Sequence, residues 1–150
     1  MRGDRAAADT ERARWQEQRQ RAISVHAEAQ RQRESSEARQ ARDLVAGFAR
    51  RATERGLRPT PLQARAFNGR ARYRTGLHGW YLKPDRSLAV GTDGEFYILA
   101  VPASVRARVT GAHLTPGQPR LTIGEGARDG ESIPLRTLLQ LRLDGGDDWP

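Results

Sequence analysis

Three features of the sequence predict an α+β fold. Residues 4–54 contain no proline and a single glycine, Gly47, and are rich in Ala, Arg, Gln and Glu, which favour helices. From residue 60 onward, short apolar runs alternate with turn sequences, which is typical of strands. A leucine-rich segment follows Pro134, a residue that often opens a helix. We expect a long N-terminal helix, then an antiparallel sheet of about five or six strands, then a short helix.

The first segment, residues 1–56, is predicted to be a helical arm. Gly56 suits the left-handed position after a helix, and Pro59 prevents the helix from resuming. In its last four turns, apolar residues recur at helical spacing, so residues 41–55 are expected to pack on the β-rich part. These apolar residues are Ala41, Leu44, Val45, Phe48 and Ala52.

The first 40 residues lack such a stripe. Their large apolar residues are Trp15, Ile23 and Val25, and no heptad pattern persists. This part is expected to project into solvent, fray or pair with a partner, with a joint at Ser35 and Ser36. Trp15 is a candidate partner-binding anchor; the alternatives are that it folds back on its own chain or is simply exposed.

A hairpin is predicted around Asn68 and Gly69, because Asn-Gly favours the type I′ turn of a two-residue hairpin loop. This placement pairs Arg65 with Arg72 across the two strands. One face then carries the small and apolar residues Leu62, Ala64, Ala66, Ala71 and Tyr73. The opposite face carries Gln63, Arg65, Phe67, Arg70, Arg72 and Arg74.

The second of these faces is the candidate nucleic-acid-binding site. Its proposed members are Arg65, Arg70, Arg72 and Arg74, with Phe67 as a stacking residue. Like charges placed opposite each other destabilise a strand pair unless an anion or the acidic C-terminal tail compensates them, and a basic ribbon with an aromatic suits a phosphate backbone. Two alternatives remain open: an ordinary solvated face, or a short helix capped by Thr60, which would abolish the ribbon.

The core of the predicted sheet lies in residues 79–101. Residues 80–82 and 87–91 are expected to form strands, and 96–101 a central strand buried on both faces. Residues 75–79 are interpreted as a glycine-flanked connection. The residues expected to be largely buried are Trp80, Leu88, Val90, Phe96, Ile98 and Leu99.

The remaining segments are less regular. Residues 105–109 suit either a strand or a short helix, 120–124 a strand, and 124–130 a surface turn. The last helix should place Leu135, Leu138 and Leu139 on one face, with Leu141 and Leu143 elsewhere. The β-rich part is therefore expected to span residues 57–143. Residues 144–150 are expected to be a flexible acidic tail or, alternatively, a short docking peptide.

Charge is unevenly distributed. The net charge of the chain is +8, and all 26 cationic side chains except Lys83 are arginine. Residues 58–86 carry seven cations and one acid, Asp85, so the positive field is concentrated there. Arginine suits phosphate recognition, although a GC-rich coding bias would also enrich it.

Composition excludes several classes. Cysteine is absent, so neither disulfides nor thiolate metal sites are possible, and no apolar run approaches the ~18 residues of a membrane span. With no secretory signal evident, a cytoplasmic location is expected. His26, His78 and His113 are isolated, and no catalytic set, metal site or cofactor motif stands out.

Two functional hypotheses follow. In the first, a non-enzymatic module binds nucleic acid, or another acidic partner, through the basic hairpin. In the second, a protein-protein interaction or assembly protein pairs through its N-terminal helix, and the basic face is incidental. An enzyme whose residues are brought together only by the fold is disfavoured. Steep salt dependence of binding would distinguish the first hypothesis from the second.

Overall fold

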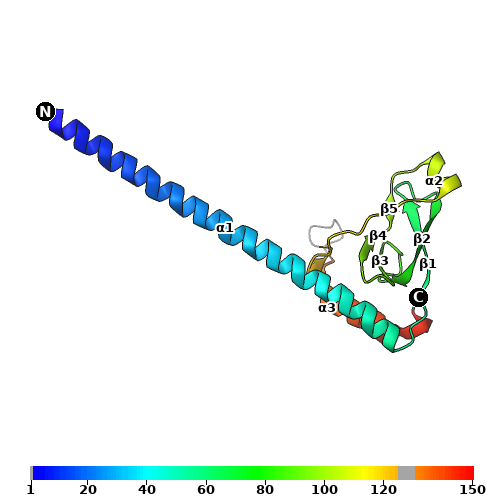
Figure 1. Cartoon of the computed structure of the whole chain (residues 1–150). Coiled ribbons are helices and arrows are strands. Elements are labelled where there is room, and N and C mark those ends of the chain that lie inside the picture. The colour runs from blue at the N-terminus through cyan, green and yellow to red at the C-terminus, as the bar shows by residue number, and fades with distance from the viewer. Residues whose placement is uncertain (1, 125–130) are drawn as a thin grey trace. The chain divides into compact units, whose positions relative to one another are not determined.

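A computed structural model describes residues 2–124 and 131–150 of the chain, and it confirms the α+β fold (Figure 1). It contains a five-stranded sheet with strand order β4-β3-β2-β1-β5 and a separate two-stranded sheet formed by β6 and β7. The elements are α1 (Arg2–Glu54), β1 (Thr60–Ala66), β2 (Arg72–Tyr81), β3 (Leu88–Gly91), β4 (Phe96–Ile98), β5 (Ala100–Val101), α2 (Val105–Thr110), β6 (Thr122–Ile123), β7 (Ile133–Pro134), α3 (Leu135–Gly145) and the 3₁₀ turn η1 (Gly146–Asp148).

The chain divides into two compact units, Met1–Ser36 and Glu37–Pro150. The described part of the first unit is wholly helical, and every residue from 2 to 36 is exposed. The boundary follows the serine pair at which the sequence suggests a joint. The second unit holds the remainder of α1, both sheets and the other helices.

Within the second unit, α1 buries the predicted apolar stripe. Ala41, Val45, Phe48 and Ala52 are at most 1% exposed, and Leu44 is partly buried. The ring of Phe48 meets that of Trp80 edge to face, with centroids 5.8 Å apart. Helix α3 lies beside this part of α1 and contributes four leucines to the same core (Figure 1). The two helices therefore cover one side of the sheet.

The sheet separates this core from a second one, because neighbouring residues of a strand point to opposite sides. In β3, Val90 faces the helices whereas Ala89 joins Leu62 and Leu99 in the other core. Strand β4 divides in the same way, with Phe96 on the helical side and Tyr97 on the other.

The predicted central strand 96–101 is wrong. It is broken at Leu99 into β4 and β5, which form the two edges of the sheet. The Leu99 amide donates to the Ser87 carbonyl at 2.8 Å, and the Leu99 carbonyl accepts from the Arg65 amide at 2.7 Å. One residue spans about 3.5 Å, whereas the edge strands of a flat five-stranded sheet would be about 19 Å apart. The sheet must therefore curl until its edges meet at Leu99.

One burial prediction is wrong. Trp80, Val90, Phe96 and Leu99 are buried as expected and Leu88 is partly buried, but Ile98 is 53% exposed. Ile98 lies on the same face of β4 as Phe96, but at the last residue of this edge strand, and it does not join the helical core.

Residues 75–79 are also not a connection, because β2 continues through them from Arg72 to Tyr81. The pairing with β1 shifts between Pro61 and Gln63. Gly76, with φ 74°, supplies the left-handed conformation, and the Thr75 hydroxyl donates to the Leu62 carbonyl at 2.6 Å. The extra residues between Arg74 and His78 form a bulge in β2. This strand pairs with β1 on one side and with β3 on the other.

The C-terminal segment differs from the predicted flexible tail. Helix α3 continues to Gly145, and Leu143 is buried on the same face as Leu135, eight residues earlier, contrary to the prediction. The Arg58 amide donates to Asp147 Oδ1 at 2.8 Å. Residues 105–110 form the helical alternative, α2, and 122–123 form a short strand. Most of the predicted turn at 124–130 lies outside the described residues.

Candidate functional site

The strands β1 and β2 form a ribbon with one buried and one exposed face, as the sequence predicts. Arg65 lies opposite Arg72, Ala64 opposite Tyr73 and Gln63 opposite Arg74. The buried face consists of Leu62, Ala64, Ala66, Ala71 and Tyr73, each at most 8% exposed. The exposed face, called the basic ribbon below, consists of Gln63, Arg65, Phe67, Arg70, Arg72 and Arg74. The helical alternative for residues 60–66 is wrong.

The arginines of the basic ribbon face solvent without a recorded counter-charge. Within residues 2–124 and 131–150, the ion pairs are Arg31 with Glu28 and Lys83 with Asp85. The opposed pair Arg65 and Arg72 therefore has no carboxylate partner in the described part of the chain. Like charges in a cross-strand pair raise the free energy of the folded state, and a bound anion would lower it.

The turn of the ribbon is not the predicted type I′. That turn needs positive φ at both central residues, but Gly69 alone has it here, with φ 73°. Instead, the Asn68 side-chain oxygen accepts from the Arg70 amide at 3.0 Å, and the Gly69 amide donates to the Ala66 carbonyl at 2.8 Å. Phe67 bonds through its amide to Val101 of β5, and its ring is 71% exposed at the tip.

A further arginine, Arg86, joins the basic ribbon from the turn after β2. Its guanidinium lies 5.3 Å from the centre of the Tyr81 ring, a cation–π contact. Arg86 has φ 59°, the only positive value among the described non-glycine residues. Such a backbone is strained and tends to occur at functional sites.

Asp85 holds this turn in place. Its Oδ1 accepts from the Ser87 amide at 3.0 Å and from the Ser87 hydroxyl at 2.7 Å. Burial works to raise the pKa of Asp85, but these hydrogen bonds and the charge of Lys83 outweigh it, so its pKa lies below the ordinary value. Asp85 is thus ionised at neutral pH and engaged within its own turn.

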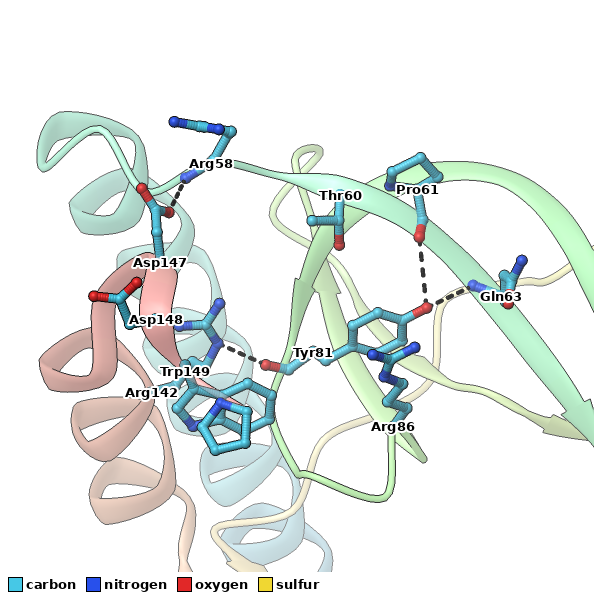
Figure 2. A pocket seen from close by; sticks show the side chains of 11 residues that line it. Arg58, Thr60, Pro61, Gln63, Tyr81, Arg86, Arg142, Asp147, Asp148 and Trp149 are labelled. Atoms are coloured by element: carbon cyan, nitrogen blue, oxygen red, sulfur yellow. Dashed lines mark hydrogen bonds between the residues drawn. The ribbon is translucent and has the colours of Figure 1, made fainter.

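A hollow of about 700 Å³ adjoins the basic ribbon (Figure 2). It is lined by Arg58, Thr60, Pro61, Gln63, Tyr81, Arg86, Arg142, Asp147, Asp148, Trp149 and Pro150. Tyr81 forms part of its wall and is held in place, since its hydroxyl accepts from the Gln63 amide at 2.9 Å and donates to the Pro61 carbonyl at 3.5 Å. The hollow thus combines two aromatic rings, three arginines and two carboxylates.

Arg142 is the most buried charged group of this hollow, at 7% exposed. Its Nε donates to the Tyr81 carbonyl and its Nη1 to the Gly146 carbonyl, both at 2.8 Å. The guanidinium carbon also lies 4.6 Å from the centre of the Trp149 ring. Burial lowers the pKa of Arg142, and the nearby charge of Asp147 opposes this effect. Because arginine ordinarily titrates far above neutral pH, the group keeps its positive charge despite its burial.

This arrangement suits the binding of an anion. The described residues include no group of three or more His, Asp or Glu side chains placed to hold a metal ion. His78 is exposed in β2 opposite Pro61. What the site offers is a row of guanidinium groups beside aromatic rings.

Sequence reasoning located the basic ribbon but missed Tyr81, Arg86, Arg142 and Trp149 as its neighbours. Arg86 lies in a recognisable turn, but no pattern predicts that its side chain returns to β2. Arg142 and Trp149 reach the hollow only because α3 packs along the sheet. Arg142 lies more than 60 residues after Tyr81 in the sequence, yet its Nε donates to the Tyr81 carbonyl.

Trp15, the candidate partner-binding residue, belongs to the first unit. Its side chain is 60% exposed, and the guanidinium of Arg19 lies 5.4 Å from its ring centre. Ile23 and Val25 are also more than half exposed.

Comparison with known proteins provides no relative: the sequence matches no family model, characterised protein or solved structure with which it was compared. None of the helices within the described residues is long and apolar enough to cross a membrane.

Proposed function

We propose that the protein is a non-enzymatic nucleic-acid-binding module that contacts the phosphate backbone through the basic ribbon. The observation that carries this proposal is the exposed pair of Arg65 and Arg72, which lie opposite each other without a carboxylate partner among the described residues. Arg70 and Arg74 extend the same charged face.

Two further features support the proposal. Guanidinium groups bind phosphate oxygens in a planar, two-point geometry. In addition, Phe67 is exposed at the tip and Tyr81 lies beside Arg86, and aromatic rings next to a basic groove are used to stack bases.

The test is a titration of a labelled oligonucleotide at several salt concentrations. For the wild type, the affinity should fall steeply with salt because each contacted phosphate releases counterions. A variant with Arg65, Arg70, Arg72 and Arg74 all changed to Gln should bind more weakly, and its salt slope should be smaller by roughly 3, corresponding to up to about four lost phosphate contacts.

A matched control removes the same charge elsewhere in the second unit. Changing Arg50, Arg51, Arg55 and Arg136 to Gln alters four exposed arginines on α1, the turn that follows it and α3. This control should lose less affinity than the ribbon variant. Equal losses in the two variants would mean that only net charge matters, and absence of wild-type binding at low salt would overturn the proposal.

A second candidate function is assembly through the N-terminal helix. It is favoured by the exposure of Trp15, Ile23 and Val25 in the first unit. In that case Trp15→Ala should weaken self-association or partner binding, and salt should have little effect because the contact is apolar. Light scattering at low and high salt measures this directly.

A further inference from the structure

We propose that the hollow beside the basic ribbon receives an unpaired base, so that the ligand of this protein is single-stranded nucleic acid. The inference rests on the proposed function and specifies its ligand. In this arrangement the phosphates lie along the arginines of the ribbon while one base enters between Tyr81, Arg86 and Trp149.

The hollow and the basic ribbon form one continuous surface. Gln63, Tyr81 and Arg86 line the hollow, and they also line a small recess together with Arg65 and Arg72. A strand bound to Arg65 and Arg72 therefore meets the hollow at Arg86 without a gap.

The hollow offers two aromatic rings on which a base can stack. Tyr81 and Trp149 are both half-buried, so each ring retains some accessible surface. Both are held in place: Tyr81 by its two hydroxyl hydrogen bonds, and Trp149 by its contact with Arg142. Rings that are already ordered lose little entropy when a base stacks on them.

Polar groups also line the hollow. Arg142 is more than nine-tenths buried as a residue, but its Nη2 makes no hydrogen bond within the described residues and remains accessible to solvent, since no buried side-chain nitrogen or oxygen among them lacks a partner. Asp148, which also lines the hollow, likewise has no recorded hydrogen bond there, whereas Asp147 accepts from Arg58. A donor and an acceptor together suit the edge of a base, which carries groups of both kinds. The carboxylates would repel a phosphate, which places the phosphates on the ribbon instead.

A base can enter such a hollow only when it is not paired. In a duplex the base edges are occupied and the rings are stacked, and extracting a base costs free energy. Single strands expose their bases for stacking on aromatic side chains. The basic ribbon alone would bind single-stranded and duplex nucleic acid alike, so the preference for single strands comes from the hollow.

The experiment compares a single-stranded oligonucleotide with a duplex of the same length and salt, using the full chain. Trp149→Leu should lower the affinity for the single strand roughly tenfold, the scale of one lost stacking contact, and leave duplex affinity unchanged. The slope of affinity against salt should also stay unchanged, because no charge is removed. Trp15→Leu is the matched control and should alter neither affinity.

Fluorescence provides a second readout that does not depend on the stability of the Trp149 variant. In the Trp15→Leu protein the remaining tryptophans are Trp80, which is 2% exposed, and Trp149. Saturating single-stranded oligonucleotide should quench Trp149, and the duplex should not. A free mononucleotide should quench it only at much higher concentration, because it lacks the neighbouring phosphates that the ribbon holds.

Three results would overturn the inference. The first is wild-type binding that shows no quenching of Trp149, which would leave the phosphate-binding proposal intact. The second is an equal loss of single-strand and duplex affinity in Trp149→Leu. The third is quenching of Trp149 by a mononucleotide at the same concentration as by the oligonucleotide, which would assign the hollow to a free nucleotide. Failure of the wild type to bind nucleic acid at all would instead remove both proposals.

Discussion

At the residue scale, the hydroxyl of Tyr97 is the most strongly perturbed titrating group in the described structure. Tyr97 is 3% exposed, and its hydroxyl donates a hydrogen bond to Asp93 Oδ2 at 2.5 Å. Burial, together with that bond and the charges of Asp93 and Glu95, raises the pKa of Tyr97 to about 12. The folded state therefore keeps this phenol neutral at a pH where an unfolded chain would ionise it.

This shift predicts a loss of stability in alkali. An unfolded tyrosine titrates near pH 10, so the stabilising effect is complete below pH 10 and is lost as the pH rises toward about 12. The loss could reach about 2.7 kcal/mol, the equivalent of two pKa units. Tyr97→Phe should be about 1 kcal/mol less stable at neutral pH but should decline less between pH 10 and 12. Urea unfolding from pH 8 to 11.5 measures both effects, and identical pH profiles would contradict the assignment.

Phe96 and Ile98 provide a second prediction at this scale, because they lie in one strand with opposite exposures of 4% and 53%. Phe96→Ala should cost roughly 3 to 5 kcal/mol, since a cavity would open beneath α1 and α3. Domains have only ~5 to 15 kcal/mol of stability, so this variant should be close to unfolding. Ile98→Ala should change stability by less than about 1 kcal/mol. Comparable melting temperatures for the two variants would show that Phe96 is not part of the core.

At the element scale, the ribbon of β1 and β2 combines a well-packed face with an electrostatically unfavourable one. Strand β1 pairs with β2 on one side and with β5 on the other. The closure at Leu99 fixes the backbone of Arg65, whose amide donates to the Leu99 carbonyl. The exposed arginines are therefore held close together by pairings on both sides.

The ribbon predicts an inverse relation between stability and binding. Changing Arg65 and Arg72 to Gln should stabilise the free protein by a few tenths of a kcal/mol, because cross-strand repulsion is removed while both side chains are exposed. The same variant should bind an oligonucleotide more weakly. Thermal melts at low salt give the first quantity and anisotropy gives the second. A variant that is less stable than the wild type would show that these arginines make favourable contacts instead.

At the scale of the whole molecule, the two units differ in what they bury. All described residues of the first unit are exposed, whereas α1 beyond Ser36 carries the core residues Ala41, Val45 and Phe48. Gln118 also donates to the Ala38 carbonyl at 3.1 Å and accepts from Arg42. The contribution of the long helix to folding is therefore concentrated in its last part.

Truncation tests this division. Deletion of residues 1–36 should leave the melting temperature of the rest within a few degrees of the intact protein, because no buried residue is lost. Deletion of residues 1–55 should abolish cooperative melting, because Trp80 and the leucines of α3 would lose their covering helix. Similar behaviour of the two truncations would show that the first unit stabilises the second. A change of oligomeric state on removing residues 1–36 would favour the assembly function.

The sequence by itself determined the features that depend on neighbours along the chain. Helical propensity and spacing predicted α1 and its buried stripe, and the register of Arg65 with Arg72 followed from the turn position and strand alternation. These follow from periodicity alone, because a strand repeats every two residues and a helix every 3.6. Even there, the type of turn was missed, since side-chain hydrogen bonding by Asn68 replaced the positive φ that the pair Asn-Gly suggested.

Only the tertiary structure decided which segments meet across long separations. The apolar run 96–101 suggests a central strand, yet its midpoint Leu99 joins the two edges of a curled sheet. In the same way, Arg86 returns to Tyr81, and the hollow is completed by Arg142 from α3 and by Trp149, which follows η1. Apolar burial is non-directional, so a hydrophobic run indicates that a segment is buried but not which segment covers it. Which segment covers it depends on how the backbone hydrogen bonds close over the whole sheet. That closure involves residues far apart in the sequence, so no short stretch of sequence predicts it.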